Sequence, residues 1–169
     1  MESLNARAPE RTAEPSSDRI RLARWVAIAA AVVGTDQVTK ILLRANLAEG
    51  EAWPYPDAWF AISHVENSGA AFGMFQGAGI WLLAVTVLGV SGLLFYVYRY
   101  PPQHRLYVMA LALILGGAIG NLIDRAMKGS VTDFLDPRYY PAFNIADSAI
   151  VIGVGAIIML SFLEARRQQ

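Results

Sequence analysis

Two aspartates in the second half of the chain have the residue type and setting that peptide hydrolysis can use. Asp133 lies in the stretch VTDF, and Asp147 lies in FNIADS, at the mouth of an apolar run. Two carboxyl groups a few ångströms apart cannot both ionise readily, so they hold one proton between them near neutral pH. One can then take a proton from water while the other polarises a scissile carbonyl. We interpret Asp133 and Asp147 as a candidate catalytic pair.

Other hydrolytic chemistries find little support in the sequence. The chain has no cysteine, no G-x-S-x-G motif, and no H-E-x-x-H motif around His64 or His104, which we expect at the surface. A serine–lysine dyad stays open on spacing, although Lys40 lies in an apolar segment and Lys128 in a loop. We expect no metal and no cofactor. The net charge is zero and no long basic patch is present, so we expect no nucleic-acid partner.

Each acidic residue also has a simpler interpretation. A carboxylate at Asp147 would cap the following helix equally well, because the first turn of a helix attracts negative charge. Asp133 could be a solvated loop residue, and Asp136, which precedes Pro137, is typical of a turn. Spacing alone leaves these alternatives open.

Four long apolar segments must position these residues. Hydrophobic residues make up 55% of the chain and charged residues only 17%. The segments 25–43, 80–98, 106–123 and 145–163 are 18 or 19 residues long, enough for helices that cross a hydrocarbon core of about 30 Å. Asp36 and Lys40 interrupt the first segment at spacing i, i+4, and we expect them to neutralise each other inside the bundle. The sequence predicts an all-α membrane protein, a four-helix transmembrane bundle.

The distribution of basic residues predicts the orientation. Nine arginines lie in the N-terminal tail, the 99–105 turn and the C-terminal tail, against four basic residues in the two remaining loops. This bias places both termini in the cytoplasm. A cleaved secretory signal peptide is a competing interpretation of the first segment, but no Ala-x-Ala site with a soluble domain behind it follows. We expect a disordered cytoplasmic tail at 1–20, one membrane domain at 21–165 and a cytoplasmic tail at 166–169.

The two outer loops, roughly 44–79 and 124–143, should carry the polar chemistry. The first contains WFAISHVENSGAAFGMF, which predicts short strands, turns and a small β-sheet cradle on the membrane surface. Its glycines make 50–79 a candidate lid. Polar residues repeat the spacing i, i+3, i+4 at the outer ends of the last two spans, which predicts a shared pocket; they are Asn121, Asp124 and Arg125, then Asn144, Asp147 and Ser148.

Five blocks in order carry a resemblance to a known family: DQVTK, ENSGAAFGMF, GGAIGNLIDR, GSVTDF and PAFNIADS. Together they resemble lipoprotein signal peptidase, also called signal peptidase II, over residues 24–163. The resemblance implies an aspartic endopeptidase of the bacterial inner membrane that cuts prolipoproteins before a diacylglyceryl cysteine on the periplasmic side. It also implies Asp133 and Asp147 as the catalytic pair. The substrate-binding residues it implies are Asn67, Asn121, Arg125 and Asn144.

The partners expected from the resemblance are membrane-embedded prolipoproteins and the lipid bilayer, and the sequence indicates no oligomeric state. A rival from another class is a small four-helix transporter or scaffold, coupled to protons or ions through Asp36, Lys40, Asp124 and Asp147. Such a protein needs polar residues through the membrane depth. The polar clusters of the last two spans gather on one side instead, which favours surface chemistry.

Overall fold

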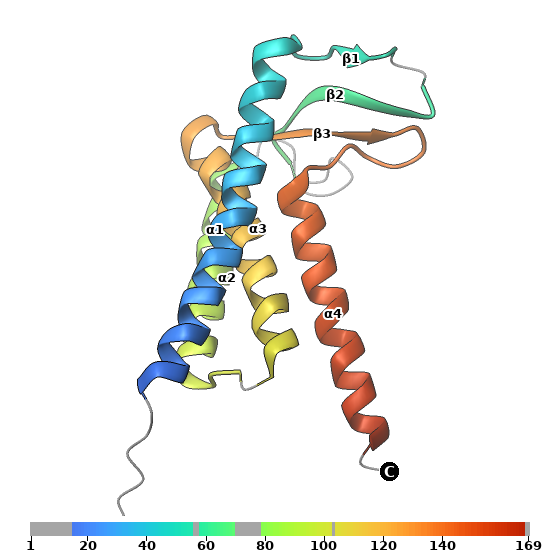
Figure 1. Cartoon of the computed structure of the whole chain (residues 1–169). Coiled ribbons are helices and arrows are strands. Elements are labelled where there is room, and N and C mark those ends of the chain that lie inside the picture. The colour runs from blue at the N-terminus through green and yellow to red at the C-terminus, as the bar shows by residue number, and fades with distance from the viewer. Residues whose placement is uncertain (1–14, 56–57, 70–78, 103, 168–169) are drawn as a thin grey trace, which may run out of the picture.

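The structure, a computed structural model, describes residues 15–55, 58–69, 79–102 and 104–167. Four helices make up most of it: α1 (Pro15–Asn46), α2 (Gly79–Arg99), α3 (Arg105–Lys128) and α4 (Ile145–Arg167). All four are long and apolar enough to cross a membrane. A three-stranded sheet lies at one end of the helices (Figure 1) and consists of β1 (Ala52–Trp53), β2 (Phe60–Asn67) and β3 (Val131–Pro137). The predicted bundle with a small sheet is confirmed.

α1 begins earlier than the sequence analysis expected. Its first described residue is Pro15, so the helix extends into the range 1–20 that was assigned to a disordered tail, while residues 1–14 lie outside the described residues. The candidate lid at 50–79 is also only partly covered. β1 and β2 occupy part of that stretch, but residues 56–57 and 70–78 lie outside the described residues.

α3 packs against each of the other three helices and forms the centre of the bundle. Glycines allow its backbone to approach its neighbours closely. A methyl group added at Gly116 would meet the backbone oxygen of Ala29 in α1 at 2.8 Å, and one added at Gly117 would collide with the backbone oxygen of Ala146 in α4. Close contact between small residues is how membrane helices gain packing energy where the hydrophobic effect is weak.

The sheet is antiparallel in the order β1–β2–β3, and a bulge between Ile62 and Val65 shifts the register of β2 against β3. Beyond the bulge Val65 lies opposite Asp133, and Asn67 lies opposite Val131. Asn67 is therefore a diagonal neighbour of Asp133 on the same face, within reach of its side chain. The bulge thus decides which residues of β2 meet Asp133.

Local hydrogen bonds fix the two helix ends on either side of β3, the end of α3 and the start of α4. α3 ends at Gly129, which adopts φ 77° and donates its N–H to the backbone oxygen of Arg125 over 3.0 Å. Glycine adopts this left-handed conformation without a steric penalty. α4 begins with a reciprocal cap: the N–H of Asp147 donates to Asn144 Oδ1 over 2.9 Å, and the N–H of Asn144 donates to Asp147 Oδ2 over 3.3 Å. This is the capping-box arrangement.

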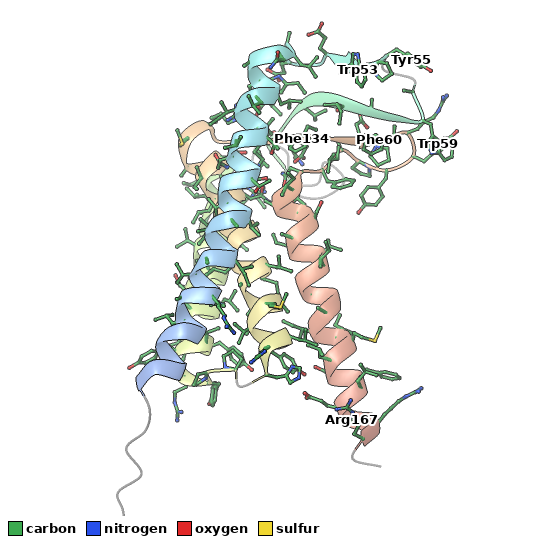
Figure 2. All side chains as sticks on the ribbon, viewed as in Figure 1. Trp53, Tyr55, Trp59, Phe60, Phe134 and Arg167 are labelled. Atoms are coloured by element: carbon green, nitrogen blue, oxygen red, sulfur yellow. The ribbon has the colours of Figure 1, made fainter. Side chains whose placement is uncertain are left out.

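Aromatic side chains gather at the end of the sheet that is farther from α1 (Figure 2). Trp53, Tyr55, Trp59 and Phe60 are all exposed there, and the ring of Trp59 packs edge-on against Tyr139 at 5.5 Å. Amphipathic rings of this kind settle at the headgroup level of a bilayer. Arg167 lies at the opposite end of the molecule, in the basic last turn of α4.

Candidate active site

The fold brings Asp133 and Asp147 to one place, although they belong to different elements. Asp133 is in the middle of β3, and Asp147 is in the first turn of α4. Asn144 connects them: its side-chain amide donates to Asp133 Oδ1 over 2.7 Å, while its backbone N–H donates to Asp147 Oδ2. Asp133 is only 2% exposed and lies in a strand, so the solvated-loop interpretation of this residue is wrong.

Each of the four carboxyl oxygens of the pair accepts an N–H from an asparagine. Asn67 Nδ2 donates to Asp133 Oδ2 over 2.9 Å, and Asn121 Nδ2 donates to Asp147 Oδ1 over 2.7 Å; Asn144 supplies the other two donors. All three asparagines were expected near the pair. Such charge-assisted hydrogen bonds hold a carboxylate in one orientation, which general acid–base catalysis requires.

The proton affinity of Asp133 is well suited to acid–base chemistry at neutral pH. Burial, the largest cause, raises its pKa from 3.8 to about 6. The negative charge of Asp147 acts in the same direction, whereas the hydrogen bonds from Asn67 and Asn144 and the positive charge of Lys40 act against it. A carboxyl group with such a pKa exchanges a proton readily near pH 7.

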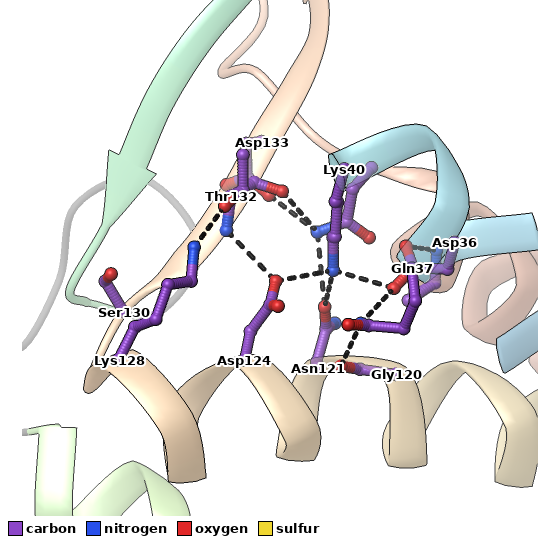
Figure 3. A network of polar contacts seen from close by, with 12 residues as sticks. Asp36, Gln37, Lys40, Gly120, Asn121, Asp124, Lys128, Ser130, Thr132 and Asp133 are labelled. Atoms are coloured by element: carbon purple, nitrogen blue, oxygen red, sulfur yellow. Dashed lines mark hydrogen bonds and ion pairs between the residues drawn. The ribbon is translucent and has the colours of Figure 1, made fainter. Parts of the chain in front are cut away.

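A buried ionic cluster contacts Asn121, the residue that donates to Asp147 (Figure 3). Lys40 is fully buried and contacts Asp36 Oδ2 at 2.8 Å and Asp124 Oδ2 at 2.9 Å. The predicted pairing of Asp36 with Lys40 is therefore confirmed, with Asp124 as a second partner. Asp36 also accepts the N–H of Ala146 over 3.0 Å, so this cluster fixes the start of α4.

Arg125 lies in α3, and its side chain is only partly exposed. The negative charges of Asp147, Asp133 and Asp124 attract its guanidinium. Within the described residues it makes no hydrogen bond or ion pair with either member of the candidate pair. A cation that is attracted to the pair without binding it can interact with a third group that enters the site.

A second polar cluster around Glu66 was missed by the sequence analysis. Glu66 accepts hydrogen bonds from Ser130, Thr132 and Lys128 on the β3 side, and it contacts the ring Nε2 of His64 at 3.2 Å. His64 is buried and its Nδ1 contacts the backbone oxygen of Leu47, so the expected surface position of His64 is wrong. The spacing of two between His64 and Glu66 was a signal that both share one face of a strand.

The remaining predicted residues lie apart from this centre. Asp136 lies near the end of β3, opposite Ala61, so the interpretation of Asp136 as a turn residue is wrong. His104 is exposed, as expected, and caps α3 by accepting the N–H of Leu106 over 3.3 Å. Ser148 donates back to the oxygen of Asn144 within the first turn of α4. These positions serve local structure rather than the candidate pair.

Comparison with known proteins connects this site to one family. Residues 28–163 match the family model described as signal peptidase (SPase) II. The lipoprotein signal peptidase of Moorella thermoacetica is 42% identical over 145 residues, which cover 85% of this chain and 96% of the relative. That of Caldanaerobacter subterraneus subsp. tengcongensis is 47% identical over 135 residues, which cover 79% of this chain and 91% of the relative.

Two solved structures have a similar fold to this chain. One bacterial membrane enzyme superposes with a TM-score of 0.81 at 30% identity, covering 87% of this chain and 92% of its own. A second bacterial membrane enzyme superposes with a TM-score of 0.73 at 32% identity, covering 82% of this chain and 92% of its own. The arrangement of helices and sheet described above is thus shared with membrane enzymes.

Proposed function

This chain belongs to the signal peptidase II family, and from that premise we propose that it removes signal peptides from prolipoproteins whose cysteine carries diacylglycerol, with Asp133 and Asp147 as the catalytic pair. The family makes the protein a bacterial membrane protease. The single observation that carries the catalytic assignment is the set of four asparagine N–H groups, one to each carboxyl oxygen of the pair.

In the proposed reaction the ionised member of the pair accepts a proton from a water molecule as the water oxygen attacks the scissile carbonyl carbon. The protonated member donates its proton to the carbonyl oxygen. When the tetrahedral intermediate collapses, the C–N bond breaks, the leaving amine takes a proton from the protonated member of the pair, and a hydroxyl group of the intermediate returns a proton to the ionised member, so the pair again holds one proton. Buried donors that are already oriented lower the cost of the charges that develop during these steps.

We assign substrate binding to Arg125 and to the asparagines Asn67, Asn121 and Asn144. The attraction of Arg125 to the pair, without a hydrogen bond to it, leaves its guanidinium suited to a substrate carbonyl oxygen. The asparagines have a double role in this proposal, because they orient the pair and border the place where the peptide backbone must lie.

The proposed location is the bacterial inner membrane, with both termini in the cytoplasm and the site at the periplasmic side. The excess of arginines at the end of the bundle opposite the sheet supports this orientation. The aromatic end of the sheet would then lie at the outer interface, beside the candidate pair. We propose one domain at 21–165, and the acyl chains of the substrate would stay in the bilayer while its peptide enters the site.

The transporter alternative finds no support in the ionic cluster. Asp36, Lys40 and Asp124 pair with one another and with the start of α4, at the level of the candidate pair. They do not form a series through the depth of the membrane, which a proton or ion path requires.

The proposal is tested with purified full-length protein in micelles and a synthetic precursor that carries diacylglyceryl cysteine. Release of the leader peptide, followed by mass spectrometry, is the expected result. The same precursor without the lipid should be cut far more slowly. If the wild-type protein releases no leader, or cuts both precursors equally, the proposed function is wrong.

A further inference from the structure

Lys40 has an environment that fixes where its protons point. Its side chain is fully buried, and Nζ lies 2.8 Å from Asp36 Oδ2, 2.9 Å from Asp124 Oδ2 and 3.2 Å from Asn121 Oδ1. A lysine ammonium has three donor hydrogens and no acceptor. Three acceptors therefore use all three hydrogens, and the atom of Asn121 that faces Lys40 must be the oxygen (Figure 3).

This contact decides the direction of the next hydrogen bonds. Because the oxygen of Asn121 faces Lys40, its Nδ2 faces Asp147 and donates to Oδ1 over 2.7 Å. The same oxygen accepts from Asn144 Nδ2 over 3.2 Å, and that nitrogen also donates to Asp133 Oδ1. A flipped Asn121 would set a nitrogen against two donors and an oxygen against a carboxylate oxygen, which leaves buried polar groups unsatisfied.

We propose that Lys40 is a positioning residue of the peptidase site: it fixes the amide of Asn121 so that an N–H always faces Asp147. This inference rests on the proposed function, since it assigns a part in cleavage to a residue that touches neither water nor substrate. Asn144 has a second constraint, because its oxygen accepts the N–H of Asp147. Asn121 is thus the residue whose orientation depends most on Lys40.

Lys40 also contributes a positive charge close to the pair. Its charge lowers the pKa of Asp133, against the larger effect of burial, which raises it. Removing Lys40 should therefore shift the pH dependence of cleavage to higher pH. The charged groups that contact Lys40 or act on the pair are Asp36 from α1 and Asp124 and Arg125 from α3. Farther out, Arg44 from α1 lies 3.8 Å from Asp124, and Glu66 from β2 accepts from Thr132, which directly precedes Asp133.

The test compares Asp36→Asn with the double variant Asp36→Asn/Lys40→Met. The double variant removes one carboxylate and one ammonium together, so the buried cluster keeps its net charge, and Asp124 keeps Arg44 at 3.8 Å. The amide introduced at position 36 retains an oxygen for the N–H of Ala146 in both variants. The two variants differ only at position 40, so the difference between them reports the effect of Lys40. Thermal unfolding in micelles checks that both variants are folded.

Relative to Asp36→Asn, the double variant should lose about tenfold or more in kcat with little change in KM. Its pH profile should move upward by about half a pH unit or more. A structural role for Lys40 would change thermal stability without moving the profile. The same pH profile and kcat for both variants would overturn the inference, whereas a wild-type protein that cuts nothing would overturn the proposed function instead.

A measurement on the wild-type protein keeps the inference testable if the double variant does not fold. The chain has two lysines, Lys40 and Lys128, so lysine labelled with nitrogen-15 at Nζ gives two signals, and Lys128→Arg assigns them. We expect Lys40 to give an ammonium signal whose protons exchange slowly with water. The nitrogen-15 chemical shift of this signal should change as Asp133 titrates. A neutral amine signal, or an ammonium signal that ignores this titration, would overturn the inference.

Discussion

The side-chain amide of Asn144 donates to Asp133 Oδ1 over 2.7 Å and so attaches the cap of α4 to the middle of β3. The same residue caps α4 by accepting the N–H of Asp147. Capping and candidate catalysis were alternative interpretations of Asp147, but the geometry makes them compatible. A carboxylate that closes a capping box has a fixed orientation, which also suits a catalytic group.

Replacing either member of the pair should stop cleavage without unfolding the protein. Asp133→Asn and Asp147→Asn each remove a carboxyl group that must exchange a proton, so leader release should fall by at least about a hundredfold. The measurement is the rate of leader release by purified variants, alongside their thermal unfolding midpoints.

Asp136→Asn is the matched control for these two variants. It lies three residues after Asp133 in the same strand, near the end of β3, and it should keep wild-type activity. Wild-type rates for Asp133→Asn or Asp147→Asn would refute the assignment of the pair, and loss of activity in all three variants would point to a general effect on β3 and α4.

The raised pKa of Asp133 predicts a pH-dependent stability. Between about pH 3.8 and 6 the folded protein holds a proton that the unfolded chain has released, so stability falls as pH rises across this window. A shift of about two units corresponds to about 3 kcal/mol. The difference in unfolding midpoint between wild type and Asp133→Asn should change across this range and stay level above pH 7. A constant difference from pH 4 to 8 would show that burial does not raise the proton affinity of Asp133.

The sequence predicted the elements well because their signals are local. Apolar runs of 18 or 19 residues mark the spans directly, and the i, i+4 spacing of Asp36 and Lys40 places both on one helix face. The longer extent of α1 was not predicted, because helix ends beyond an apolar run depend on polar residues with weak preferences. Asp124 as a second partner of Lys40 depends on the packing of α1 against α3, which no single segment encodes.

The surroundings of Asp133 could not be predicted from sequence for a related reason. Its contact with Asn67 depends on the register of β2 against β3, and the bulge between Ile62 and Val65 sets that register. A shift of one residue would turn Asn67 to the other face. His64 was expected at the surface because an isolated histidine carries no burial signal, whereas the fold covers it and supplies Glu66 as a partner.

The Glu66 cluster should stabilise the sheet at the point where Asn67 reaches Asp133. Burial tends to raise the pKa of Glu66, but hydrogen bonds from Ser130, Thr132, Lys128 and His64 outweigh it and hold the pKa at about 2. Glu66→Gln replaces these charge-assisted bonds by weaker ones, so the protein should lose about 1 to 3 kcal/mol and cleave more slowly. Thermal unfolding and leader release measure both effects.

The pH dependence of this variant has a defined sign. Because the folded pKa of Glu66 is lowered, its contribution is present above its ordinary value of 4.5 and is lost as pH falls towards 2. The stability difference between wild type and Glu66→Gln should therefore shrink in acid. Glu164→Gln is the control, since Glu164 is exposed and accepts from Tyr107 at the other end of the bundle. Equal effects of the two substitutions on stability would argue against a stabilising role of the Glu66 cluster.

Chelators should leave cleavage unchanged. Among the described residues no group of three or more His, Cys, Asp or Glu side chains could hold a metal ion. The carboxyl pair and its asparagine donors account for the proton transfers by themselves in the proposed mechanism. Leader release is compared before and after dialysis against EDTA. A loss of activity that added zinc or magnesium restores would require a metal in the mechanism.

Close packing of α3 against α4 should be as important for cleavage as the polar contacts. A methyl group at Gly117 would collide with the backbone oxygen of Ala146 and meet Ile150 Cγ1 at 2.8 Å, and Ala146 directly precedes Asp147. Gly117→Ala should therefore push the start of α4 away, cost about 1 to 3 kcal/mol and weaken the contact between Asn121 and Asp147. Gly155→Ala adds the same methyl group in α4, where nothing lies within 4 Å, and should be neutral or slightly stabilising. Unfolding midpoints and leader release for both variants test this: equal stability and equal rates would mean that α4 can shift at Gly117 without disturbing the pair.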